Sequence, residues 1–89
     1  MGKRVEAGGR ALEWRETRHR CWSTETAGFR ADVEQDNVVG NYGWRVIVDL
    51  KGRSYEVASG FMPGSFEEAA EVAQVVGVLL GKRQWTWRE

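Results

Sequence analysis

The sequence predicts an α+β fold in which a small antiparallel β-sheet of four or five strands carries one C-terminal α-helix on one face. Three observations lead to this fold class. Apolar and polar residues alternate along several short stretches of residues 12–59, which is typical of strands with one buried face. Turns rich in glycine and asparagine separate these stretches. Residues 66–80 then carry apolar side chains at helical spacing, directly behind a capping pattern.

The length of the chain indicates one domain. Eighty-nine residues are enough for a single hydrophobic core and too few for two. Residues 1–10 contain two adjacent glycines and no apolar periodicity, so we expect a flexible N-terminal arm there. The single α+β domain is expected in residues 11–89.

The first strands are expected within residues 12–35. Residues 12–26 alternate weakly and are too many for one strand. We therefore expect a break near residues 16–18, which would give either two short strands or one bent strand with a bulge. Ala27 and Gly28 are typical of a tight turn, after which residues 29–33 alternate again.

Residues 43–59 predict a β-hairpin. An asparagine- and glycine-rich loop over residues 36–43 precedes it, and the turn at residues 51–53 reverses the chain. The alternation on both sides of this turn is the clearest strand pattern in the sequence. The residues expected to fill the core from this hairpin are Trp44, Val46, Val48, Tyr55 and Val57.

The helix is expected over residues 66–80. Ser65 and Glu68 have the spacing of a capping box, in which the serine hydroxyl accepts the amide of the glutamate. Gly81 stands where a C-terminal helix cap belongs. The stripe expected to pack on the sheet comprises Phe66, Ala69, Ala70, Ala73, Val76 and Leu80.

The end of this helix and the tail at residues 82–89 predict a protein interface. Residues 75–80 are apolar on all sides, and such a helix is usually covered on more than one side. Either the tail folds back over the helix, or another protein chain covers both. The candidate protein interface consists of Val75, Val78, Leu79, Trp85 and Trp87.

A second candidate surface combines arginine with tryptophan. Arginines on phosphates and aromatic rings on bases are the means by which single-stranded nucleic acids are held. We expect Arg18, Arg20 and Trp22 to share one strand face. Against this hypothesis, 13 basic and 13 acidic residues cancel, whereas nucleic-acid-binding domains are usually basic. The candidate nucleic-acid face consists of Arg15, Arg18, Arg20, Trp22 and Arg30.

The sequence predicts no catalytic residues, metal site, cofactor or small-molecule ligand. His19 and Cys21 lack a third residue that would orient them as a nucleophile and base, and they are too few to hold structural zinc. Cys21 is the only cysteine, so no intramolecular disulfide forms and we expect a reducing, cytoplasmic location. The longest apolar run, residues 75–80, is too short to span a bilayer, so no membrane partner is expected.

Residues 43–80 resemble several families of small domains in element order. The strand–turn–strand–helix order is similar to that of double-stranded-RNA-binding domains and of the arm-binding domains of tyrosine integrases. However, Glu67 and Glu68 stand where the RNA-binding family has lysines. The Trp-x-Val hairpin and Ser-x-Glu-Glu-Ala helix start also resemble short phage and actinobacterial proteins.

The favoured hypothesis is a small, non-enzymatic protein-interaction module. It would be an accessory or inhibitor protein of a phage or mobile element, or a domain that self-associates. The alternative is a nucleic-acid-binding module of the ββα type that uses the arginine–tryptophan strand face.

Overall fold

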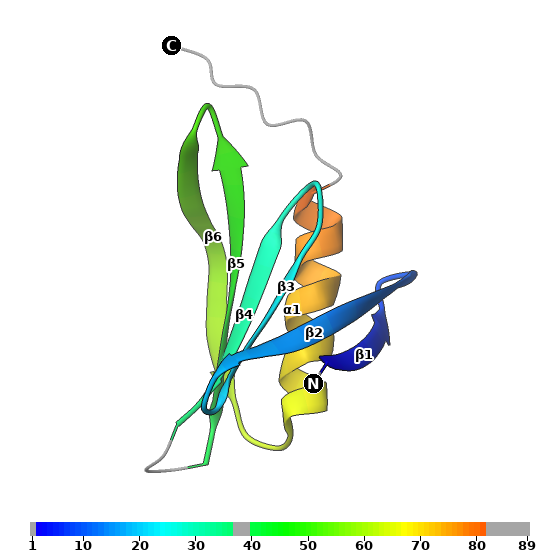
Figure 1. Cartoon of the computed structure of the whole chain (residues 1–89), viewed down its shortest axis with the longest axis vertical. Helices are drawn as coiled ribbons and strands as arrows, with labels where there is room; N and C mark the ends of the chain where they lie inside the picture. The colour runs from blue at the N-terminus through cyan, green and yellow to red at the C-terminus, as the bar shows by residue number, and fades with distance from the viewer. Residues whose placement is uncertain (1, 37–39, 82–89) are drawn as a thin grey trace.

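A computed structural model describes residues 2–36 and 40–81. Six strands form one antiparallel sheet, and one helix packs on it (Figure 1). The predicted α+β class with a C-terminal helix is confirmed, but the prediction of four or five strands is wrong. The elements are β1 (Gly2–Ala7), β2 (Arg10–Arg18), β3 (Cys21–Glu25), β4 (Arg30–Gln35), β5 (Tyr42–Leu50), β6 (Arg53–Met62) and α1 (Phe66–Gly81).

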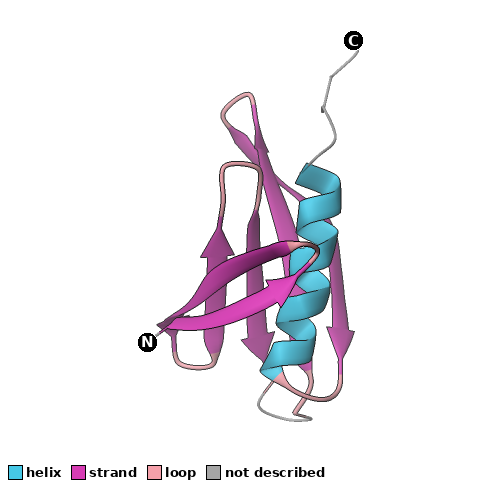
Figure 2. Ribbon diagram, turned by 90° about the vertical axis from the view of Figure 1, so that its right-hand side faces the viewer, coloured by secondary structure: helices cyan, strands magenta, loops and turns pink. Residues whose placement is uncertain are grey.

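The sheet is a simple meander that wraps around the helix. Each strand pairs with its neighbours in the chain, so the sheet has β1 at one edge and β6 at the other. Contacts link α1 to β4 and β5, and also to β1. Figure 2 shows the β1–β2 hairpin crossing α1 while the other strands lie behind it. The helix is therefore enclosed between the two ends of one sheet.

The expectation of a flexible arm over residues 1–10 is wrong, because Gly2–Ala7 forms strand β1. Gly8 and Gly9 have φ angles of +65° and +80°. Two consecutive positive φ angles make the two-residue hairpin turn whose twist matches that of the strands. This turn pairs Ala7 with Arg10, and Val5 is 5% exposed. The glycine pair therefore starts the sheet.

The predicted break near residues 16–18 is confirmed as the end of β2. The pairing with β3 shifts register between Glu16 and Arg18, and Arg20 takes a positive φ of 64° in the turn that follows. The predicted hairpin over residues 43–59 is also confirmed. It is longer than expected, since β5 already begins at Tyr42.

Phe66 is the centre of an aromatic cluster that holds the start of α1 on the sheet. The ring of Trp14, which is completely buried, meets the Phe66 ring edge-on at 5.9 Å. The ring of Trp22 lies 4.8 Å from the same ring, and Trp22 also contacts Tyr42. Trp44 is half-buried against the core. The three tryptophans in the described part of the chain therefore serve the core.

The predicted helix stripe is correct in its first half and rotated in its second half. Phe66, Ala69, Ala70 and Ala73 are buried as expected. Farther along, Val78 is buried, whereas Val76 and Leu80 are only half-buried. The β1–β2 turn causes this difference, because a Cβ placed on Gly8 would lie 3.3 Å from Val75 Cα. The β1–β2 hairpin of the chain itself therefore covers the Val75 and Val78 side of the apolar helix end.

Gln74 fastens that hairpin to the helix. Its side chain is completely buried, and its Oε1 accepts a hydrogen bond from Trp14 Nε1 at 3.0 Å. Its Nε2 donates to the carbonyl oxygens of Val5, Ala7 and Arg10 at 3.0, 3.2 and 2.9 Å. A buried amide is tolerated when its donors and acceptor are all used, and here they are.

A surface ion pair adds a pH-dependent contact between β1 and α1. Lys3 Nζ lies 3.3 Å from Glu67 Oε1 and 5.2 Å from the centre of the Phe66 ring. The pKa of Glu67 is lowered from its ordinary value of 4.5, first by a backbone hydrogen bond at Glu67 itself and also by Lys3. A carboxylate whose pKa is lowered in the folded state stabilises the protein at pH values above its ordinary pKa. This contribution disappears as the pH falls through the folded-state pKa.

We therefore expect Lys3→Met to reduce stability slightly at neutral pH and to have a smaller effect in acid. Both side chains are largely exposed, so the effect is that of a screened surface pair. Urea unfolding of the original protein and of Lys3→Met, at neutral pH and well below pH 4.5, measures the difference in their stability. A difference that grows in acid would contradict this account.

Candidate protein-interaction site

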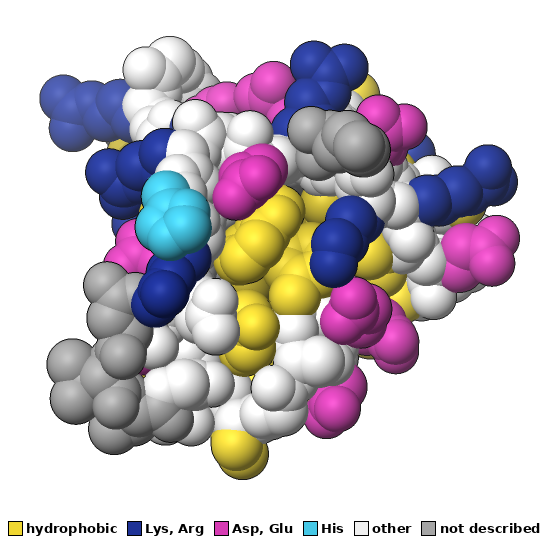
Figure 3. Space-filling model, turned by 60° about the horizontal axis from the view of Figure 1, so that its bottom comes forward, with side chains coloured by type: hydrophobic (Ala, Val, Ile, Leu, Met, Phe, Trp, Pro, Cys, Tyr) yellow, Lys and Arg dark blue, Asp and Glu magenta, His cyan; other side chains and the backbone are white. Residues whose placement is uncertain are grey.

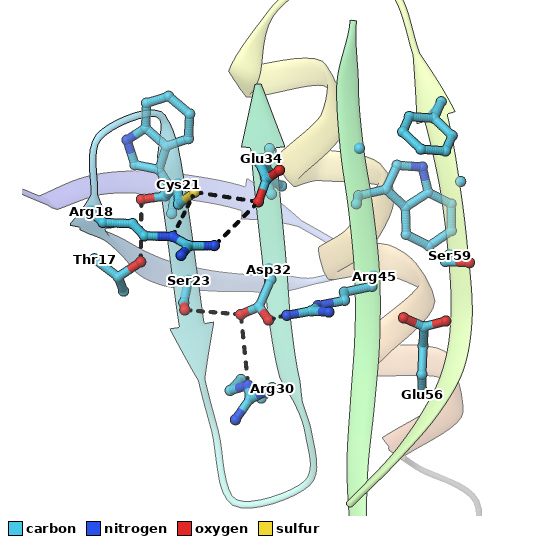
Figure 4. Close-up of a pocket in the computed structure, with 16 residues that line it drawn as sticks. Thr17, Arg18, Cys21, Ser23, Arg30, Asp32, Glu34, Arg45, Glu56 and Ser59 are labelled. Atoms are coloured by element: carbon cyan, nitrogen blue, oxygen red, sulfur yellow. Dashed lines mark hydrogen bonds and ion pairs between the residues drawn. The ribbon is translucent and has the colours of Figure 1, made fainter. Parts of the chain in front are cut away.

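The face of the sheet opposite α1 carries a hollow of about 620 Å³, which polar side chains line (Figure 4). Asp32 is the centre of its hydrogen-bond network. Its carboxylate accepts hydrogen bonds from Ser23 Oγ at 2.9 Å and from Arg45 Nε at 3.0 Å. Arg30 Nε lies 3.6 Å from the same carboxylate. The charges in this network pair with one another.

A second group in the hollow surrounds Cys21. Arg18 Nε donates to Cys21 Sγ at 3.3 Å, and Sγ donates to Glu34 Oε2 at 3.5 Å. Hydrogen bonding with Cys21, and then the negative charge of Glu34, raises the pKa of Arg18. His19 instead accepts a hydrogen bond from Arg20 at 3.2 Å. In the part of the chain that the structure describes, no three His, Cys, Asp or Glu side chains gather as metal ligands would.

The expectation that Arg18, Arg20 and Trp22 share one strand face is wrong. Trp22 lies at the rim of the hollow, but its ring packs against Phe66 of α1. Arg18 precedes the β2–β3 turn and pairs with Cys21 on the hollow side, while Arg20 lies in the turn itself. The turn and the register shift beside it separate the three side chains, because a one-residue slip reverses the face of a strand residue.

The remaining arginines of the predicted nucleic-acid face are only partly brought together. Arg18 and Arg30 both line the hollow, and Arg15 is paired with Ser23, another lining residue. Arg18 forms an ion pair with Glu34, and Arg30 forms one with Asp32. The face is therefore mixed in charge and is not a basic strip.

The predicted protein interface is also divided. Val78 is 3% exposed and belongs to the core, so its inclusion in an exposed interface is wrong. Val75 is half-buried, and Leu79 is 61% exposed. Trp85 and Trp87 lie outside the described residues. Among the described members of the predicted set, Leu79 is the one large exposed hydrophobic.

The two edges of the sheet differ in their protection. β1 carries Lys3, Arg4 and Glu6, contacts α1, and has carbonyl groups bonded to Gln74. Such charges and coverings are the usual protection of an edge strand. β6 pairs only with β5 in the described sheet.

A bulge divides β6 into two parts. The pairing shifts register where Val46 faces Ala58 and Ile47 faces Glu56, which leaves Val57 as the extra residue. Before the bulge β6 carries Arg53 and Glu56, whereas residues 58–62 (Ala-Ser-Gly-Phe-Met) carry no charge and no proline. We call residues 58–62 the β6 edge segment. Bulges and charges blunt edges, so within residues 2–36 and 40–81 the segment beyond the bulge is the part of β6 without such protection.

Two adjacent pairs fix aromatic rings against glycines at this edge. Phe61 is paired with Gly43, and a Cβ on Gly43 would lie 3.0 Å from the Phe61 ring. Trp44 is paired with Gly60, and a Cβ there would again lie 3.0 Å from the ring. Successive strand residues point to opposite faces, so Trp44 lies toward α1 and Phe61 lies on the side of the hollow. Phe61 is nevertheless 77% exposed.

The β6 edge segment ends beside an apolar patch. Met62 is paired with Tyr42, which contacts Trp22, and all three side chains are half-buried. Figure 3 views this end of the molecule and shows hydrophobic side chains gathered at its middle, with acidic and basic side chains around them. An apolar centre with a polar rim is typical of protein interfaces.

Comparison of the chain with family models, with curated proteins and with solved structures finds no match. The resemblances in element order therefore remain predictions. Within residues 2–36 and 40–81, no helix combines the length and the apolar character needed to cross a membrane.

Proposed function

We propose that the protein is a non-enzymatic protein-interaction module that binds an extended segment of its partner along the β6 edge segment. The observation that carries this proposal is an uncharged strand edge with a large aromatic side chain, Phe61, 77% exposed at its end. Exposed strand edges are used for recognition by strand addition, in which main-chain hydrogen bonds supply affinity and side-chain pockets supply specificity.

The geometry of the edge favours this mode of binding. An added strand beside residues 58–62 would bring alternate side chains next to Ser59 and Phe61, both of which line the hollow. Phe61 supplies an aromatic anchor whose ring lies against Gly43. Glu56 at the hollow supplies a carboxylate for the partner's polar side chains, whereas Arg45 is paired with Asp32. Aromatic side chains, phenylalanine included, are enriched at the centres of protein interfaces.

Nucleic-acid binding receives less support from the same face. Asp32 and Glu34 pair with Arg30 and Arg18, so the arginines are not available as a row of phosphate contacts. The aromatic ring expected to stack on bases, Trp22, contacts Phe66. We expect no binding to single-stranded DNA or RNA with the steep salt dependence that phosphate contacts produce.

Replacing Phe61 with serine is expected to weaken partner binding by about tenfold or more without unfolding the protein. The test begins with peptides selected from a random display library against the folded protein, followed by titration of a selected peptide into ¹⁵N-labelled protein. The largest chemical-shift changes are expected at residues 58–62. Phe61 is 77% exposed, so we expect Phe61→Ser to stay folded, and circular dichroism is the measurement that checks this.

Leu79→Ser decides between this surface and the one predicted from the sequence. Leu79 is the other large exposed hydrophobic of the described chain. Binding that persists in Leu79→Ser and is lost in Phe61→Ser supports the β6 edge segment. Binding that depends on Leu79 alone, or shift changes confined to other strands, would overturn the proposal.

A further inference from the structure

We propose that the partner of the β6 edge segment is a second copy of this chain, joined antiparallel across a two-fold axis at Gly60. This inference rests on the proposed strand addition at β6. It follows from the observation that the segment carries no charge that would repel an identical segment and has a glycine at its centre. Symmetric pairing of two identical surfaces is the commonest form of protein dimer.

The two faces of the segment match in this register. With Gly60 opposite Gly60 of the second copy, Ser59 faces Phe61, and Ala58 faces Met62. Within the sheet, Ser59 is paired with Arg45, and Phe61 is paired with Gly43. Both of these β5 residues lie on the hollow face, so both members of the new Ser59–Phe61 pair lie on that face. Ala58 is paired with Val46, which is in the core, and Met62 is paired with Tyr42, which packs against the core. Both members of the new Ala58–Met62 pair therefore lie on the α1 side. A register slipped by one residue would place hollow-side residues opposite core-side residues.

The register also brings the two exposed phenylalanines within reach of each other. Each Phe61 would face Ser59 of the second copy, and the two Phe61 residues would be diagonal neighbours on the same face. Diagonal neighbours in an antiparallel pair are about 7–8 Å apart, which aromatic side chains span. The central glycine pair offers no side chain to obstruct the approach of the two backbones. Phe61, the more exposed of the two large exposed hydrophobics in the described chain, would thereby be covered.

The surroundings leave room for this pairing. In the described part of the chain, α1 lies over β4 and β5 and contacts β6 less than it contacts β1, β4 or β5, so the helix does not overhang the edge. The charged residues of β6 are Arg53 and Glu56, and the bulge separates both of them from the new pairs. Because only five residues of each strand take part, the buried area falls in the class of small, transient interfaces. We therefore expect a dimer that dissociates on dilution.

Sedimentation velocity over a wide range of concentrations tests the association. We expect a reversible monomer–dimer equilibrium that is weakened about tenfold by Phe61→Ser, since an aromatic anchor is removed. Leu79→Ser is expected to leave the equilibrium unchanged. A monomer at every concentration, or a dimer lost in Leu79→Ser and kept in Phe61→Ser, would overturn the proposal.

A disulfide trap tests the register itself. Directly opposed strand residues lie within the Cα separation that a disulfide accepts, and diagonal ones lie beyond it. In a Cys21→Ser background, we mix the single variants Ser59→Cys and Phe61→Cys under mild oxidation. The mixed dimer is expected to form faster than either homodimer. Equal rates for all three would contradict pairing centred on Gly60.

The peptide titration separates this inference from the proposed function. A monomeric protein that still binds selected peptides at residues 58–62 overturns the self-pairing and keeps the interaction module. A dimer whose formation competes with those peptides supports both. Failure of both experiments would overturn both.

Discussion

Replacing Gln74 with alanine is expected to lower the free energy of unfolding by about 3 kcal/mol, because a buried donor loses its partner and a cavity is left. Trp14 Nε1 is completely buried and donates only to Gln74 in the described contacts. The three carbonyl groups that accept from Gln74 would lose the link between the β1–β2 hairpin and α1. Urea unfolding, followed by tryptophan fluorescence and by circular dichroism, measures the loss.

Gln35→Ala is the matched control, because the Gln35 side chain is only half-buried and the hydrogen bond that Gln35 donates to the Arg20 carbonyl comes from its backbone amide. We expect a change within about 0.5 kcal/mol there, as is usual for surface substitutions. The double variant Trp14→Phe with Gln74→Leu removes donor and acceptor together. It should lose less than the sum of the single variants, since coupled partners are not additive. Additive losses would contradict the contact between Trp14 and Gln74.

Replacing Gly77 with alanine is expected to destabilise the protein by about 2 kcal/mol, although alanine is the better helix former by about 1 kcal/mol. Gly77 lies in the interior of α1, where the ring of Phe29 reaches the helix backbone. A Cβ on Gly77 would lie 2.4 Å from Phe29 Cε2, which no real side chain permits. Phe29 is 4% exposed and belongs to the hydrophobic core, so displacing its ring would disturb the packing around it.

Shortening Phe29 provides the rescue test for Gly77. In a Phe29→Leu background, Gly77→Ala should cost less, because the ring atoms that meet the new methyl group are gone. Thermal unfolding of the four proteins in this cycle measures the coupling. If Gly77→Ala stabilises the protein that retains Phe29, the packing of that ring on the helix is not as described.

The elements with strong local patterns could be predicted from the sequence, and those that depend on a single turn could not. The hairpin around Lys51 and the helix after Ser65 follow from alternation and capping, and both are found. The first strand was missed because Gly8 and Gly9 were interpreted as flexible, whereas two positive φ angles close a hairpin. The faces of Arg18 and Trp22 were wrong because a register shift separates them.

The candidate site depends on facts that no local pattern contains. That β6 lies at an edge follows from the order of all six strands. The exposure of Phe61 follows from the bulge at Val57. The extra residue changes which side chains face α1 in the part of β6 that follows, so Phe61 lies on the opposite face. Gln74 looks like a surface residue in the helical pattern. It is buried because the first hairpin crosses over α1.

The difference between the two sheet edges is tested most directly by amide hydrogen exchange measured residue by residue. In dilute protein, we expect slow exchange in β1 around Val5 and fast exchange at the outward-facing amides of residues 58–62. On addition of a selected peptide, or on raising the protein concentration, protection should increase at residues 58–62 and stay unchanged in β1. Amides of residues 58–62 that are already protected in dilute protein, or protection gained only elsewhere, would contradict the assignment of β6 as the binding edge.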